Sequence, residues 1–75
     1  MGRLAGFGYS EIAHRLRMFG FEVDRRARGS HEIWYNALTH KRTVVPHHGG
    51  DTPEWTLHAI LKRAGISANE FLDAK

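Results

Sequence analysis

The sequence predicts an α+β domain in which a three-stranded antiparallel sheet carries helices on one face. Three observations predict this class: a segment with helical periodicity comes first, three short strand-like segments follow it directly, and further helical segments close the chain. Consecutive strands joined by short turns pair in the antiparallel sense, and two helices suffice to cover one face of such a sheet. The opposite face is expected to remain open to solvent or to a partner.

The first helix is predicted to follow Ser10, whose hydroxyl is expected to cap its N-terminus. Ile12 and Leu16 recur at helical spacing while charged residues occupy the other face, which indicates an amphipathic helix of about ten residues. Gly20 is expected to end this helix in the left-handed conformation. Residues 1–9 contain three glycines and no clear period, so we expect them to form a loosely held lead-in.

Three strands of a meander are predicted after this helix, at residues 21–25, 31–36 and 43–45. The turn at residues 26–30 contains Gly29, which is free to adopt a positive φ. Pro46 is expected to end the third strand, because proline cannot donate a hydrogen bond to a ladder. Trp34 and Tyr35 point to opposite faces of the second strand, and both are interpreted as core residues.

Two helices are predicted in the last third of the chain. Thr52 and Pro53 are expected to be the N-cap and first residue of the longer one. Gly65 is expected to end it, and Ser67 is expected to open a short final helix through a capping box with Glu70. The predicted buried stripe of the longer helix consists of Leu57, Ile60, Leu61 and Ala64.

Composition excludes several classes of protein. The chain has 75 residues, which we interpret as a single domain spanning residues 1–75, and no cysteine, which excludes disulfides and thiolate chemistry. No run reaches the roughly 18 apolar residues of a membrane span, and no secretory signal is recognised, so a cytoplasmic protein is expected. The eleven Lys and Arg exceed the eight Asp and Glu, and eight of the eleven are Arg, whose planar fork suits phosphate.

A series of short motifs runs along residues 9–72. They are Gly20-Phe21, Gly29-Ser30-His31 with Glu32-Ile33-Trp34, Pro46-His47-His48-Gly49, the stretch Thr56 to Leu61, Ala64-Gly65-Ile66 and Glu70-Phe71. In this order and spacing the chain resembles the HicA-type (YcfA-like) toxins, the mRNA interferase half of a bacterial toxin–antitoxin pair. One departure is visible, because Trp55 stands where the family usually has glycine.

The resemblance implies a fold like that of double-stranded-RNA-binding domains, α-β-β-β-α, which agrees with the predicted order of elements. It also implies an endoribonuclease that cleaves mRNA and inhibits translation. The family's catalytic histidine follows Gly-Ser, so it corresponds to His31 here. A HicB-type antitoxin is the implied partner, and we expect it to cover the active face and hide His31.

The residue types around His31 suit cleavage of RNA without a metal or other cofactor. Histidine titrates near neutral pH, so its imidazole can act as general base or general acid. Arginine can stabilise negative charge on a phosphoryl group, and Arg26 and Arg28 are the predicted phosphate contacts, with Arg25 beside them. Whether water or the 2′-hydroxyl attacks the phosphorus stays open. No recognised metal-ligand spacing is present, so no metal site is predicted.

Other candidate RNA-binding residues have simpler interpretations. Gly29 can bring the backbone close to a phosphate, although a turn explains it equally. Ser30 can hold the ring of His31, contact RNA or bond to a strand edge. His48 is either a second acid–base group or a structural cap.

Two rival functions remain open at this point. A non-catalytic RNA-binding module of the double-stranded-RNA type fits the order of elements and the charge, although such modules bind through lysine-rich helix starts and the predicted second helix has none. A pure protein-interaction domain would use the open sheet face and Trp55.

Overall fold

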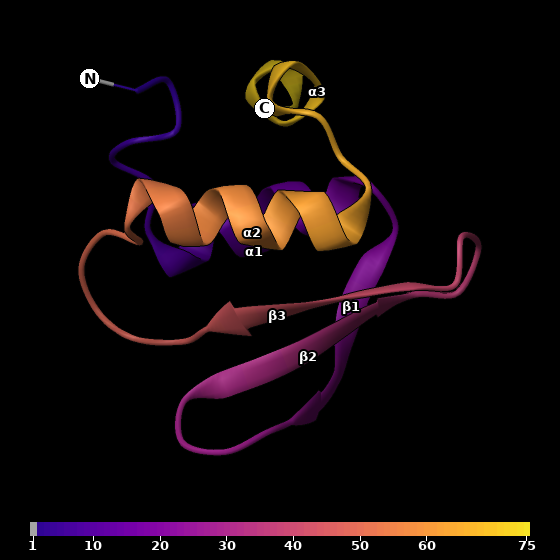
Figure 1. Ribbon diagram of the computed structural model, residues 1–75. Helices are drawn as coiled ribbons and strands as arrows, with labels where there is room; N and C mark the ends of the chain where they lie inside the picture. Colours follow the sequence, from indigo (N-terminus) through magenta and orange to yellow (C-terminus); the bar gives the residue numbers. More distant parts are fainter. Residues whose placement is uncertain (1) are drawn as a thin grey trace.

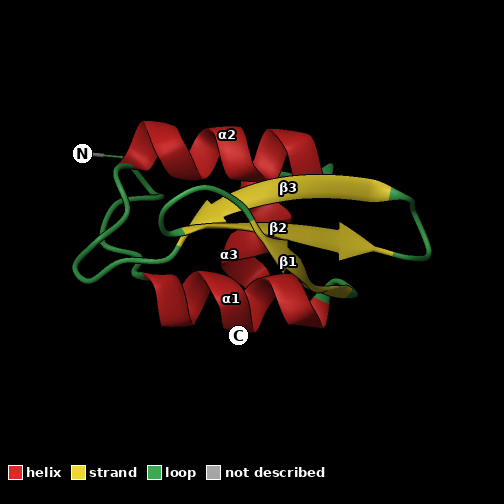
Figure 2. Cartoon of the chain, turned by 90° about the horizontal axis from the view of Figure 1, so that it is seen from below, coloured by secondary structure: helices red, strands yellow, loops and turns green. Residues whose placement is uncertain are grey.

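The protein is described from a computed structural model that covers residues 2–75. Its elements in chain order are α1 (Tyr9–Met18), β1 (Phe21–Arg26), β2 (His31–Asn36), β3 (Lys41–Pro46), α2 (Glu54–Ala64) and α3 (Ala68–Asp73). The helices lie on one side of the sheet (Figure 1). Seen from the other side, no helix covers the strands (Figure 2). The predicted α+β class and its α-β-β-β-α arrangement are confirmed, and α3 is the short final helix that was also predicted.

The sheet has the order β1-β2-β3, and both pairs are antiparallel. β2 and β3 pair without interruption from His31 opposite Pro46 to Asn36 opposite Lys41. The pairing of β1 with β2 shifts register between Val23 and Arg25. Such an irregularity bends and twists an edge strand, and Phe21 is the only buried residue of β1. β1 is therefore held in the core by Phe21 at its start, and its other residues are exposed to solvent.

The core lies between the sheet and the helices. Trp34 is completely buried at its centre. The predicted stripe of α2 is confirmed, because all four of its residues are buried. The prediction that Tyr35 also belongs to the core is wrong: it is half-buried on the uncovered face, where the guanidinium of Arg42 lies 4.3 Å from the centre of its ring. The core is formed by Leu4, Ile12, Ala13, Leu16, Phe21, Trp34, Val45, Leu57, Ile60, Leu61, Ala64, Ile66 and Phe71.

The start of the chain is not the loosely held lead-in that was expected over residues 1–9. Met1 lies outside the described residues, but Leu4 is only 1% exposed, and Phe7 packs against the same core. The carbonyl of Phe7 accepts a hydrogen bond of 2.7 Å from the amide of Thr52. Gly8, rather than Ser10, is the N-cap of α1. Burial of the apolar side chains of this segment offsets the conformational entropy that its glycines lose when the segment becomes ordered.

Three further element boundaries can be compared with their predicted positions. β3 begins at Lys41 rather than residue 43, because His40 adopts a φ of 62° and reverses the chain earlier. The N-cap of α2 is Pro53 and not Thr52. The capping box at Ser67 is confirmed in both directions, as are the positive φ values of Gly20, Gly29 and Gly65.

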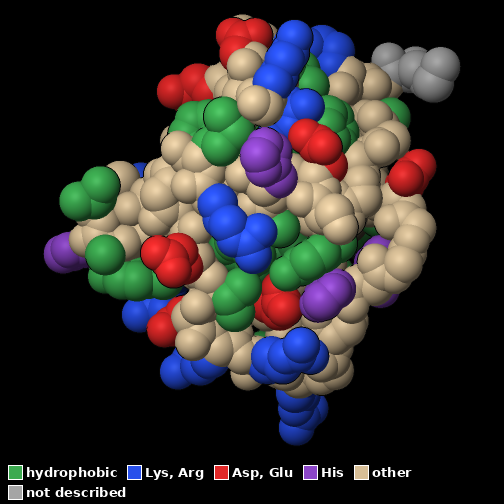
Figure 3. Space-filling model, turned by 180° about the vertical axis from the view of Figure 1, so that it is seen from behind, with side chains coloured by type: hydrophobic (Ala, Val, Ile, Leu, Met, Phe, Trp, Pro, Cys, Tyr) green, Lys and Arg blue, Asp and Glu red, His purple; other side chains and the backbone are tan. Residues whose placement is uncertain are grey.

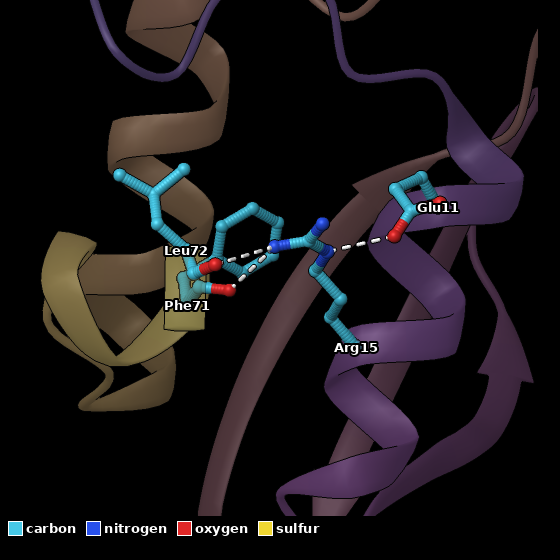
Figure 4. Close-up of polar contacts among 4 residues, drawn as sticks. All are labelled: Glu11, Arg15, Phe71 and Leu72. Carbon is cyan, nitrogen blue, oxygen red and sulfur yellow. Dashed lines mark hydrogen bonds and ion pairs between the residues drawn. The ribbon is translucent and has the colours of Figure 1, made fainter. Parts of the chain in front are cut away.

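Arg15 joins α1 to α3 (Figure 4). Its Nε donates to the carboxylate of Glu11 at 2.7 Å, and another guanidinium nitrogen donates to the carbonyl oxygens of Phe71 at 2.8 Å and Leu72 at 3.3 Å. The cation also lies 4.9 Å from the ring centre of Phe7. A charged donor thereby satisfies carbonyls near the end of a short helix and fixes α3 over the core.

Candidate functional site

His31 is the first residue of β2, and its side chain is exposed at the end of the sheet. The tight turn before it sets this position: the amide of His31 donates to the carbonyl of Arg28 at 3.2 Å, and its carbonyl accepts from the amide of Ala27 at 2.8 Å. Gly29 supplies the positive φ of 61° that this turn requires. The backbone of His31 is thus fixed by hydrogen bonds, while its side chain is exposed.

The imidazole of His31 lines a groove of about 300 Å³ between the β3 edge of the sheet and α2. Trp55, Ala59 and Arg63 follow one another at intervals of four residues, so they form one ridge of α2 along this groove. The other lining residues are Val44, Pro46, Thr56 and Ile60. The groove therefore combines an apolar lining with one imidazole and one guanidinium. Arg63 was not singled out from the sequence, and Trp55 was considered only as a surface for a protein partner, although the helical spacing of the two residues was visible.

The predicted arginines lie on the hairpin that precedes His31. Arg25 and Arg26 end β1, Arg28 lies in the turn, and all three are exposed. Basic side chains project at the lower edge of the molecule in Figure 3, where the β1–β2 turn lies in Figure 1. None of the three lines the groove itself. The three arginines precede His31 in the chain and lie outside the groove. They can therefore bind a polyanion only if it extends beyond the groove.

Ser30 and His48 are placed differently. The carbonyl of Ser30 accepts a hydrogen bond of 2.8 Å from the amide of His47, so its backbone continues the β2–β3 ladder past Pro46. His48 lies away from the groove, in a second hollow with the start of α1, and its Nδ1 donates to the carbonyl of Gly49 at 2.9 Å. The structure therefore does not bring His48 into the groove that His31 lines.

A buried carboxylate that sequence reasoning did not single out lies next to His31 in the chain. Glu32 is only 5% exposed. Its Oε1 accepts from the hydroxyl of Tyr9 at 2.6 Å and from the indole of Trp34 at 3.2 Å, and its Oε2 lies 3.2 Å from Nδ1 of His47. The ring of His47 stacks on that of Tyr9 with centres 3.8 Å apart. This network ties the end of β3 and the start of α1 to β2.

These contacts change the acidity of both partners. Burial raises the pKa of Glu32, but the hydrogen bonds from Tyr9, His47 and Trp34 outweigh burial, so the pKa of Glu32 lies below its usual value. Burial, followed by the hydrogen bond to Glu32, raises the pKa of Tyr9 to about 12. At neutral pH the carboxylate is therefore ionised and the tyrosine is a permanent donor.

Replacing Glu32 by glutamine is expected to lower the free energy of unfolding at pH 7 by about 1–3 kcal/mol, because a buried charged acceptor of three hydrogen bonds is lost. A carboxyl whose pKa is depressed by folding stabilises above its unfolded pKa of about 4.3 and ceases to do so as pH falls through the lower folded value. The difference between the two proteins should therefore shrink in acid. Urea unfolding across this pH range measures it.

Glu22→Gln is the matched control for this prediction, because Glu22 is exposed on β1 and takes no part in the hydrogen bonds of this network. The control should leave the acid dependence of stability close to that of the unsubstituted protein. A constant gap between Glu32→Gln and the unsubstituted protein from neutral to strongly acid pH would contradict the prediction.

Two properties of the described chain bear on other kinds of site. Within residues 2–75, no three side chains of His, Asp or Glu gather in a way that could hold a metal ion. Over the same residues, no helix has both the length and the apolar character needed to cross a membrane.

The fold and the groove define a class of protein: a small α+β domain whose sheet is backed by helices and whose sheet end presents a histidine beside arginines. The family model described as the HicA toxin of bacterial toxin–antitoxin matches residues 9–66 of the 75-residue chain. The chain therefore belongs to the HicA toxin family. It is the toxin of a toxin–antitoxin system, which implies an antitoxin partner. A search of curated proteins finds no match.

Proposed function

We propose that this toxin is an endoribonuclease that cleaves mRNA and thereby inhibits translation, with His31 as its catalytic residue. The observation that carries the proposal is the exposed imidazole of His31, held by a fixed backbone in a groove that also contains Arg63. The resemblance that places the family's catalytic histidine after Gly-Ser supports the same residue. Its mRNA substrate places the proposed action in the cytoplasm.

The proposed reaction joins an attacking oxygen to phosphorus and breaks the bond from phosphorus to the 5′ oxygen. The attacking hydroxyl gives up its proton to a base, and the departing 5′ oxygen takes up a proton from an acid. His31 serves one of these two transfers, since a neutral imidazole accepts a proton and an imidazolium donates one. Arg63 offsets the negative charge on the phosphoryl oxygens in the groove. The hairpin arginines Arg25, Arg26 and Arg28 contact neighbouring phosphates of the same RNA. Gly29 and Ser30, in the turn before His31, complete the proposed RNA-binding residues, together with His48 outside the groove.

Metal ions are not required for this chemistry, so we expect cleavage of RNA by the purified toxin to continue at an unchanged rate in the presence of a chelator. A 2′-deoxy substitution at the cleaved position then identifies the nucleophile. We expect it to abolish cleavage at that position, because the neighbouring hydroxyl is the oxygen already held closest to the phosphorus. Gel analysis of a labelled transcript measures both effects.

The same assay can contradict each part of the proposal. Loss of cleavage with the chelator would show a metal requirement, and continued cutting at the deoxy position would assign the attack to water. A natively folded toxin, free of antitoxin, that leaves diverse transcripts intact would remove the proposed activity altogether.

We propose further that the antitoxin is of the HicB type and inhibits by covering the groove that His31 lines. The exposed groove and the uncovered sheet face support a shared surface for RNA and partner. Modification of histidine by diethyl pyrocarbonate, followed by mass spectrometry, tests this arrangement. His31 should be protected in the complex, and equal reactivity of His31 in the free and bound toxin would argue against occlusion.

A further inference from the structure

Trp55 is a large aromatic side chain left in solvent. It is 76% exposed, whereas Trp34 is 0% exposed. The exposure is not that of a loop residue, because Trp55 lies in the first turn of α2, which packs against β3. Among residues 2–75, the other exposed large apolar side chains, which are Met18, Val23 and Leu38, do not line the groove. Trp55 therefore combines a rigid support, a free indole ring and a place beside His31.

The surroundings of Trp55 favour one kind of occupant. Val44, Pro46 and Ala59 give the groove an apolar lining, and the small side chain of Ala59 separates Trp55 from Arg63 along the helix. Arg63 places a positive charge two helical turns beyond the indole, and His31 lies on the opposite, sheet side. A flat apolar ring at one end of a groove that also holds two groups suited to an anion matches a nucleobase joined to its phosphate.

We propose that Trp55 stacks on the base of a single-stranded RNA nucleotide adjacent to the phosphate that His31 acts on. The inference rests on the proposed function and deepens it, because it names the form of RNA that the groove accepts. A base inside a duplex has both faces covered by its neighbours and cannot stack on an outside ring without leaving the helix. Trp55 is thus a specificity-determining residue that selects unpaired RNA.

Tryptophan fluorescence tests the stacking directly, because the chain has two tryptophans and Trp34 is shielded from ligands. The experiment uses the His31→Ala protein, so that the RNA stays intact, and a short unstructured RNA with the same strand in a duplex as comparison. We expect quenching by the single strand and not by the duplex. Trp55→Phe should retain most of the affinity, and Trp55→Ala should weaken single-strand binding about 5- to 100-fold, as loss of one stacked base predicts.

Leu38→Ala is the matched control, since Leu38 is 90% exposed in the β2–β3 turn and lies outside the groove. It should bind and cleave RNA as the unsubstituted protein does. Thermal unfolding of each variant distinguishes loss of the stacking contact from loss of the folded structure. Trp55→Phe keeps an aromatic ring at this position and serves as a second variant for the test.

Three outcomes would overturn the inference. Equal RNA affinity of Trp55→Ala and its parent would do so, as would equal quenching by duplex and single strand. A Trp55→Ala toxin that cleaves normally but binds its antitoxin more weakly would assign the indole to a protein partner. In each case the proposed function would stand if the unsubstituted toxin cleaves RNA. A toxin that binds single strands through Trp55 and never cuts them would instead overturn the proposed function and retain the stacking contact.

Discussion

Replacing His31 by alanine is expected to reduce RNA cleavage by about 10²- to 10⁴-fold, the usual contribution of a positioned general acid or base. The fold should survive, because the imidazole is exposed and the hydrogen bonds of residue 31 are made by its backbone. Cleavage of a labelled transcript by the purified protein measures the effect. Growth arrest on expression should disappear in parallel.

His58→Ala is the matched control for this prediction, because His58 is an exposed histidine of α2 that does not line the groove. It should cleave RNA at the original rate. The His31→Ala protein should still bind RNA, with the steep salt dependence of phosphate contacts, since the arginines are untouched. Unchanged growth arrest by His31→Ala would remove the catalytic role and favour a non-catalytic RNA-binding module.

Replacing Trp34 by alanine is expected to lower the free energy of unfolding by about 3–5 kcal/mol, the cost of truncating a large buried aromatic side chain. Trp34 is completely buried and also donates to Glu32, so the change leaves a cavity and weakens the polar network. A domain of this size has little stability to lose, and we expect most of the variant to be unfolded at 37 °C. Urea unfolding followed by circular dichroism measures the loss.

Trp55→Ala is the comparison for this second prediction, because it is the same substitution at an exposed position. Its free energy of unfolding should change by no more than about 0.5 kcal/mol. Similar losses at the two positions would mean that the indole of Trp34 does not hold the core together.

Most elements of the fold could be predicted because their signals lie within a few neighbouring residues. Ile12 and Leu16 recur at helical spacing and are buried, and the capping box at Ser67 forms as its spacing predicted. Gly20 and Gly65 mark helix ends because few other residues accept their backbone conformation. Each of these signals acts over one or two turns of chain.

Two predictions failed because a distant segment changed the outcome. Residues 2–8 have no periodicity, yet they are held because Leu4 reaches the core and Phe7 bonds to Thr52. Tyr35 has a strong strand preference but lies on the uncovered face, since no helix packs there. Nothing in the local sequence records which side of a strand a helix will cover.

The candidate site divides in the same way. The sequence alone was enough to single out His31, its arginine-rich turn and the resemblance to the HicA family, because these occupy one continuous stretch. Only the tertiary structure decided that His31 shares a groove with Trp55 and Arg63, that His48 lies elsewhere, and that Glu32 is the centre of a buried network. The physical reason is that a groove forms where strands and a helix far apart in the chain pack together, and that packing depends on the shape and burial of the whole core.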